Sequence, residues 1–209
     1  MFYEPGAGHP FPRNPFKALV APRPIGWVST RTAAGVNNLA PYSFFNGVAD
    51  SPPMVMFSST GLHPHGAKDT ADTAIATGAF VVNIATYGLR DAMNASSEIV
   101  PPDVDEFALA GLTAVPSALV SAPRVAQAPV NLECRTVNHV ALPDGGEGRN
   151  LVVFGEVVGI HIDPSVMTDG FVDMAKLQPI ARLGYRDYAV VRETFSMGRP
   201  GGGDAAVGM

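Results

Sequence analysis

The sequence predicts a mainly β protein, a closed barrel with helices on its outer surface. Most apolar runs are short, rich in β-branched and aromatic residues, and separated by Gly, Pro and Asn turns, which is typical of barrel strands. Few segments have helical spacing. No G-x-G-x-x-G motif follows a strand, so neither a Rossmann dinucleotide site nor its doubly wound sheet is expected.

Composition narrows the class of protein further. The chain has 209 residues, of which 46% are apolar, enough for the core of one domain. Its net charge of −5 argues against a broad nucleic-acid surface, which would need to be basic. No stretch reaches the ~18 apolar residues of a membrane span. A single cysteine, Cys134, and no signal-like N-terminal run indicate a cytoplasmic protein without a disulfide.

We divide the chain into three parts. Residues 1–15 form an arm that is too rich in Pro and Gly for a regular element and is expected on the surface. Residues 16–196 form the single folded domain. Residues 197–209 are rich in Gly and are expected to be a flexible tail.

The first half of the domain is expected to supply four strands. The first contains Trp27 and Val28, which favour extended structure. A turn over 31–37, where Gly35 can take a positive φ, leads into the second. The double proline at 52–53 precedes the third. These strands are expected at 25–29, 39–46, 54–58 and 80–85.

Three helices are expected between and after these strands. The first begins at Asp69 or Thr70, buries one apolar face and ends at Gly78. The third begins at Asp103, whose side chain caps it, with Glu106 as the reciprocal capping partner. The helices are expected at 69–78, 89–97 and 103–111.

The second half returns to strands. Two long, β-branched runs at 130–140 and 151–162 are expected to form a hairpin around a turn at 144–146. Cys134 lies within the first of these runs, so we interpret it as an inert structural thiol and not as a nucleophile.

Several catalytic chemistries find no support in the sequence. No G-x-S-x-G motif indicates a hydrolase. His63 and His65 are close together, but no third ligand has recognisable spacing, so no metal site is expected.

A phosphate site is one interpretation of the start of the first helix. Lys68 supplies a cation and Thr70 a hydroxyl, and Asp69 lies between them. Free backbone N–H groups and the positive end of the helix dipole converge there and favour an anion. Ser58 and the two hydroxyl residues after it end the preceding strand and offer further donors. A capped surface helix with a solvated lysine explains the same residues equally well.

A second polar cluster lies on the first two strands, near their facing ends. Small polar residues and backbone groups there offer the donors and acceptors that a flat heterocycle with imide-like edges needs. Ordinary hairpin chemistry, in which Asn favours turns and Ser and Thr pair across strands, explains this cluster better when it is taken alone. The cluster comprises Ser29, Thr30, Asn38, Leu39, Ala40, Pro41, Tyr42 and Ser43.

Taken together and in order, these motifs resemble the flavin reductase-like proteins, which have the FMN-binding split-barrel fold. The resemblance covers about 16–188. It is carried by RPIGWVST at 23–30, NLAPYSFF at 38–45, PPMV at 52–55, KDT at 68–70, FVVNI at 80–84, DEF at 105–107, GL at 111–112, LEC at 132–134, and RLG at 182–184 with Tyr188.

The resemblance implies a six-stranded antiparallel Greek-key barrel that binds FMN at its edge, in a homodimer whose interface helps to build the site. By motif match, Ser29, Thr30 and residues 38–43 would line the isoalloxazine and ribityl chain. Ser58, Lys68, Asp69 and Thr70 would hold the phosphate. Several relatives carry an arginine in the loop before the lysine, where this chain has His63 and His65 instead.

The resemblance also implies a function. NAD(P)H would pass a hydride to the flavin, and the reduced flavin would serve a partner oxygenase or pass electrons on directly. Because the cofactor carries the redox step, no catalytic side chain is expected. The alternative is an FMN-holding electron carrier without nicotinamide turnover. A third hypothesis is a flavoprotein that acts directly on an organic substrate.

Overall fold

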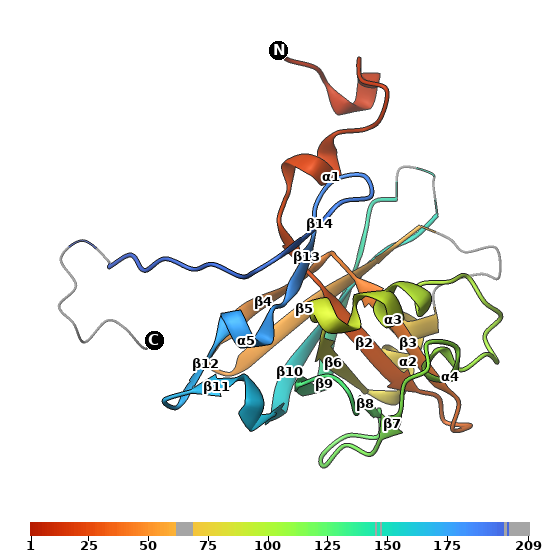
Figure 1. Ribbon diagram of the computed structural model, residues 1–209. Helices are drawn as coiled ribbons and strands as arrows, with labels where there is room; N and C mark the ends of the chain where they lie inside the picture. The colour runs from red at the N-terminus through yellow and green to blue at the C-terminus, as the bar shows by residue number, and fades with distance from the viewer. Residues whose placement is uncertain (62–68, 145, 147, 199, 201–209) are drawn as a thin grey trace.

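One antiparallel sheet of seven strands organises the computed structural model, which describes residues 1–61, 69–144, 146, 148–198 and 200 (Figure 1). The strand order is β3-β2-β6-β9-β10-β5-β4. The strands are β2 (Gly26–Arg31), β3 (Asn37–Tyr42), β4 (Phe45–Asp50), β5 (Pro53–Thr60), β6 (Ala79–Ile84), β9 (Val130–Leu142) and β10 (Asn150–Ile162).

The sheet curls around an apolar core. Tyr42 of β3 and Phe57 of β5 come from distant positions in the strand order, yet their ring centroids are 4.9 Å apart. Phe80 of β6 packs edge-on against Phe57. Helix α2 (Asp69–Thr77) adds Ala71 and Ala74 to the same core. This arrangement is the split-barrel architecture that the family resemblance implied, with β3 and β4 as the two outer strands of the sheet.

A second core lies on the opposite face of β2. Successive residues of a strand point to opposite faces, so Val28 enters the barrel core while Trp27 enters the second one. Trp27 is fully buried, and its indole N–H donates to the Ser96 hydroxyl at 2.9 Å. Helices α3 (Arg90–Ala95) and α4 (Glu106–Leu109) cover this face and contribute Met93 and Phe107.

The remaining elements are short. Strands β1, β13 and β14 form a small separate sheet that flanks the barrel. These elements are η1 (Pro5–Ala7), α1 (Phe16–Leu19), β1 (Arg23–Pro24), η2 (Tyr87–Leu89), β7 (Ala114–Val115), β8 (Arg124–Val125), η3 (Pro164–Val166), β11 (Met167–Thr168), β12 (Phe171–Val172), α5 (Met174–Leu177), β13 (Ile180–Arg182) and β14 (Tyr188–Val190). No helix in the described ranges is both long and apolar enough to cross a membrane.

The structure corrects two predicted elements. The strand expected over 39–46 is two strands, β3 and β4, because the chain turns between them and the Ser58 N–H donates to the Phe44 carbonyl at 2.8 Å. The sheet therefore has seven strands where the resemblance implied six. The helix expected from Asp103 begins at Glu106, and Asp105 caps it by accepting from the Phe107 N–H at 2.8 Å.

Other predicted elements are confirmed. Helix α2 occupies the expected segment, and Gly78 follows it with a φ of +70°. The predicted C-terminal hairpin is present as β9 and β10, although part of its turn lies outside the described residues. The N-terminal arm projects away from the barrel (Figure 1) and contains the single turn η1, where the sequence predicted no regular element. Most of the predicted tail falls outside the described residues.

Candidate functional site

A broad groove opens beside the end of β5, and we call it the Ser58 groove. Its volume is about 760 Å³. Ser58 and Thr60 lie on the same side of β5 and both line the groove, while Ser59 between them is buried. The lining residues are Phe16, Lys17, Phe44, Met56, Ser58, Thr60, Gly61, Leu142, Asp144, Arg149, Asn150 and Val152.

Arg149 gives the Ser58 groove a fixed cation that the sequence analysis missed. Its guanidinium makes two contacts with Asp72 of α2, at 2.7 and 2.8 Å. The hydrogen bond with Asp72 raises the pKa of Arg149, and this effect outweighs the opposing effect of burial. The two residues are 77 positions apart, so no local pattern reveals the pair.

A second hollow adjoins the Ser58 groove, and we call it the arginine pocket. Its volume is about 330 Å³, and Lys17 lines both hollows. Pro41 and Ser43 line the arginine pocket and Phe44 lines the groove, so the predicted ligand-binding segment lies between them. The lining residues are Lys17, Arg23, Ile25, Pro41, Ser43, Met93, Ser97, Arg182, Leu183, Tyr185 and Tyr188.

Three of the predicted residues come together where α2 begins. Thr30 and Asn38 are paired across β2 and β3, and the Thr70 hydroxyl of α2 donates to the side-chain Oδ1 of Asn38 at 2.5 Å. Both Thr30 and Thr70 are buried. The Thr30 hydroxyl has no hydrogen-bond partner in the part of the chain that the structure describes.

Glu106 completes this polar cluster from the other side. Its carboxylate accepts from the Asn38 side-chain amide at 3.0 Å and from the Leu39 N–H at 3.1 Å. Burial, with a smaller contribution from the charge of Asp105, raises the pKa of Glu106 despite these bonds. The sequence analysis gave Glu106 only a capping role, so its contact with Asn38 was not predicted.

The other predicted residues are spread over both faces of the sheet. Ser29 lies on the opposite face from Thr30, where its hydroxyl donates to the Pro123 carbonyl at 2.5 Å and accepts from the Asn83 amide at 3.0 Å. Leu39 is in the second core. Ala40 and Tyr42 pack in the barrel core, Asp69 begins α2, and Lys68, His63 and His65 lie outside the described residues.

The described residues include no candidate metal site. Within the described ranges, no group of three or more His, Cys, Asp or Glu side chains is arranged to hold a metal ion. The two hollows present hydroxyls, an amide, the cations Lys17, Arg23, Arg149 and Arg182, and a single carboxylate, Asp144. This excess of cations suits a phosphorylated or carboxylated organic ligand.

Comparison with known proteins assigns the family. The family model described as flavin reductase like domain matches residues 19–178. An uncharacterized protein of Halalkalibacterium halodurans is 40% identical over 185 residues, which cover 87% of each chain.

Two solved structures are similar across most of their length. Nitrilotriacetate monooxygenase component B from Bacillus cereus is 31% identical with a TM-score of 0.84, and the match covers 94% of this chain and 98% of that one. The 2-nitrobenzoate 2-nitroreductase NbaA of Pseudomonas fluorescens is 26% identical with a TM-score of 0.76, and 88% of each chain is covered. The chain therefore belongs to the flavin reductase-like domain family, whose members are flavin-related oxidoreductases with the split-barrel fold.

Proposed function

We propose that this protein binds FMN and reduces it with NAD(P)H. The observation that carries this proposal is that the Ser58 groove, with the Ser58 and Thr60 hydroxyls and the Arg149 cation, opens beside the 41–44 segment. The groove offers an elongated ligand hydroxyl donors and the cations of Lys17 and Arg149, and Asp144 is the one acidic residue among its described lining residues.

The groove end suits the phosphate of FMN. Ser58 and Thr60 offer hydroxyl donors, and Arg149 offers a cation held by Asp72. Helix α2 begins after β5, and the N-terminus of a helix favours an anion. We propose that Ser58, Lys68, Asp69 and Thr70 hold the phosphate. Several relatives carry an arginine where this chain has His63 and His65, and we propose that Arg149 supplies that positive charge here.

The polar cluster suits the ring and ribityl chain. A buried hydroxyl without a partner costs about 1–3 kcal/mol, and the Thr30 hydroxyl is in this state among the described residues. A ligand atom within its reach would remove that cost. We propose that Ser29, Thr30 and residues 38–43 position the isoalloxazine. Ser29 would act indirectly, by holding β2 in place, because its hydroxyl is already bonded on the other face and it is paired with Leu39 and Val81 in the sheet.

The bound flavin would supply the hydride chemistry, and the chain would supply binding, orientation and electrostatics. Glu106 accepts from the Asn38 side-chain N–H, so the side-chain Oδ1 of Asn38 faces Thr70 and the amide orientation is set before a ligand arrives. We assign no side chain the role of acid or base in the transfer.

Assembly and location extend the proposal. Exposed apolar side chains on the β9–β10 hairpin, among them Val137, Val140 and Ile160, support a homodimer. The similarity to a monooxygenase component B supports a partner oxygenase that consumes reduced flavin. The lone buried Cys134 supports a cytoplasmic location.

The decisive experiment is stopped-flow reduction of the FMN-saturated protein by NADH and by NADPH. Bleaching of the flavin absorbance by either nucleotide supports the reductase. Bound FMN that neither nucleotide bleaches supports the alternative, an electron carrier. If the purified protein shows no flavin spectrum and takes up no added FMN, the proposal is wrong.

Light scattering tests the dimer independently. We expect a mass of about twice 21.8 kDa at micromolar concentration. A monomer that still holds flavin would contradict the proposed assembly.

A further inference from the structure

We propose that the arginine pocket binds the oxyanion, a phosphate or a carboxylate, of a small ring-bearing molecule other than the flavin. Its role as the site for an electron donor or acceptor rests on the proposed function. Its binding chemistry rests only on the residues that line the pocket.

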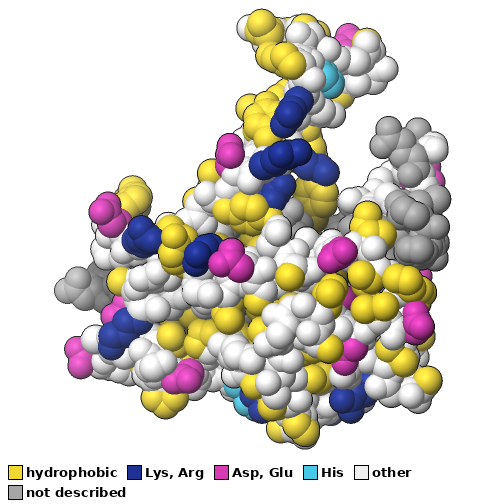
Figure 2. All heavy atoms as spheres, turned by 45° about the vertical axis from the view of Figure 1, so that its right-hand side comes forward, with side chains coloured by type: hydrophobic (Ala, Val, Ile, Leu, Met, Phe, Trp, Pro, Cys, Tyr) yellow, Lys and Arg dark blue, Asp and Glu magenta, His cyan; other side chains and the backbone are white. Residues whose placement is uncertain are grey.

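The pocket gathers positive charge without a counter-ion. Lys17, Arg23 and Arg182 line it, and no Asp or Glu does. None of the three forms an ion pair within the described residues. Figure 2 shows Lys and Arg side chains gathered along the arm and where it joins the barrel. Like charges held together destabilise the folded chain, and a bound anion reverses that effect.

Arg23 is a buried, hydrogen-bonded residue of the arginine pocket and not a mobile surface cation. It is only 6% exposed. Its guanidinium donates to the carbonyl oxygens of Lys17, Val20 and Leu183, none of which neutralises its charge. Its Nε is buried without a partner among the described residues. Burial first, and then the charge of Arg182, lower the pKa of Arg23, as expected for a cation that lacks an anion.

The backbone around Arg23 is packed tightly enough to hold this geometry. Gly184 approaches α1 so closely that a β-carbon there would lie 2.3 Å from the β-carbon of Ala18. Arg23 reaches the carbonyls of Lys17 and Leu183, on either side of this contact. The pocket is therefore preorganised, which reduces the cost of ordering it when a ligand binds.

Arg182 presents the accessible charge. It pairs with Arg23 across β1 and β13, stacks 4.4 Å from the Tyr188 ring centroid and donates to the Tyr185 carbonyl at 2.6 Å. These contacts use one of its N–H groups and fix the plane of the guanidinium. Such a fork binds the two oxygens of a phosphate or carboxylate in parallel.

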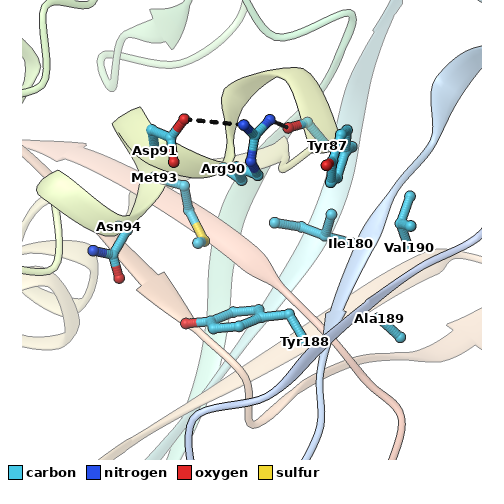
Figure 3. A pocket seen from close by; sticks show the side chains of 9 residues that line it. All are labelled: Tyr87, Arg90, Asp91, Met93, Asn94, Ile180, Tyr188, Ala189 and Val190. Carbon is cyan, nitrogen blue, oxygen red and sulfur yellow. Dashed lines mark hydrogen bonds and ion pairs between the residues drawn. The ribbon is translucent and has the colours of Figure 1, made fainter.

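A mostly apolar pocket of about 270 Å³ adjoins the arginine pocket and accounts for the ring. Its polar lining residues are Arg90, Asp91 and Asn94 of α3, and Arg90 and Asp91 form an ion pair. The two share Met93 and Tyr188. In Figure 3, Met93 points from α3 toward the Tyr188 ring, and Ile180 and Val190 complete an apolar wall. A planar ring on this wall places its anionic substituent near Arg182.

The test is calorimetric titration of the full chain, first saturated with FMN, with two probes: adenosine 5′-monophosphate and benzoate. Binding of the first assigns a phosphate and binding of the second a carboxylate. Binding of neither at millimolar concentration overturns the proposal. Binding that occurs only without flavin also overturns it, because the pocket would then hold the phosphate of FMN itself.

Two variants locate the bound probe. Arg182→Gln should weaken its binding about tenfold or more, because charge-assisted bonds are lost. Arg135→Gln removes an exposed arginine elsewhere, on β9, and should leave binding unchanged. Equal effects of the two substitutions on probe binding would overturn the proposal. Arg23 and Arg182 would then serve only to hold α1 in place. FMN uptake by Arg182→Gln confirms that it folds.

The same titrations separate this proposal from the proposed function. If the protein takes up no FMN, and binds a probe through Arg182 equally well with and without added FMN, the proposed function is wrong and the pocket is supported. If the protein binds FMN but neither probe, the pocket is wrong and the proposed function still stands.

Discussion

Arg149 and Asp72 form a bidentate ion pair, with N–O distances of 2.7 and 2.8 Å, that connects the β9–β10 hairpin to α2. The two side chains are 37% and 47% exposed, so the pair contributes little to stability. Its consequence is local. It holds a cation on the Ser58 groove, on the side where α2 begins.

The first prediction concerns the phosphate. Lys68→Ala and Arg149→Gln should each weaken FMN binding about tenfold to a hundredfold, because each removes a charge-assisted hydrogen bond worth about 1.5–3 kcal/mol. Riboflavin, which lacks the phosphate, should lose much less. Quenching of flavin fluorescence during titration measures both dissociation constants. Asp72→Asn is the matched control, since it breaks the ion pair but keeps the cation. Equal losses for FMN and riboflavin would remove the substituted residue from the phosphate site.

The second prediction concerns Cys134. The side chain is fully buried in the barrel core, and burial raises its pKa to about 12. Only the thiolate attacks a disulfide reagent, so the native protein should not react with such a reagent at pH 8. One thiol per chain should react after unfolding in guanidinium. Fast labelling of the native protein would show that the core around β9 opens readily.

Most regular elements follow from local sequence. The β-branched runs of the C-terminal hairpin predicted β9 and β10, and helical spacing with a terminal glycine predicted α2. The division of the 39–46 segment was not predictable in this way. It depends on the Phe44 carbonyl meeting the N–H of Ser58, which is on another strand.

The candidate site was less predictable than the fold, because its contacts join distant residues. The motif points to Asn38, but its partner Glu106 is 68 positions away and has a local sequence that indicates only a helix cap. Arg23 belongs to a motif that shows no role for it, because its bond to Leu183 spans 160 positions. Sequence patterns identify polar residues, whereas their partners depend on how the sheet curls.

The third prediction concerns acid stability. The buried Glu133 carboxylate accepts from the Ala118 and Leu119 N–H groups and contacts His161 at 2.5 Å. Burial alone would raise the pKa of Glu133, but these bonds outweigh it and the net shift is downward. A lowered pKa means that the stabilisation is complete above the unfolded value of 4.5 and is lost as pH falls through the folded value.

Urea unfolding between pH 7 and pH 3 measures this dependence. Glu133→Gln should lower the free energy of unfolding by about 1.5–3 kcal/mol at pH 7, the range for hydrogen bonds to a charged group. It should also reduce the acid limb, which is the decrease in this free energy as the pH falls. Glu156→Gln, on the half-buried face of β10, is the control and should leave the limb unchanged. An acid limb of the same slope in Glu133→Gln would contradict this account.

The last prediction concerns Asn38, which joins three elements. Asn38→Ala leaves the buried Glu106 carboxylate without its amide donor and the buried Thr70 hydroxyl without its acceptor. We expect a loss of about 1–3 kcal/mol in the free energy of unfolding, the cost of buried polar groups without partners, together with weaker FMN binding. Urea unfolding and flavin titration measure the two effects.

Asn37→Ala is the matched control for this prediction, because the amide of Asn37 makes a longer bond of 3.3 Å to Asp105, which lies in a half-buried position. The Asn37 side-chain oxygen also accepts from Arg31 Nε at 2.8 Å, in an exposed position. We expect Asn37→Ala to cost less than about 1 kcal/mol, because water can replace both bonds. If both substitutions cost the same, the buried network around Glu106 has no special weight. If Asn38→Ala weakens FMN binding at unchanged stability, Asn38 contacts the ligand and does not act by joining β3 to α2 and α4.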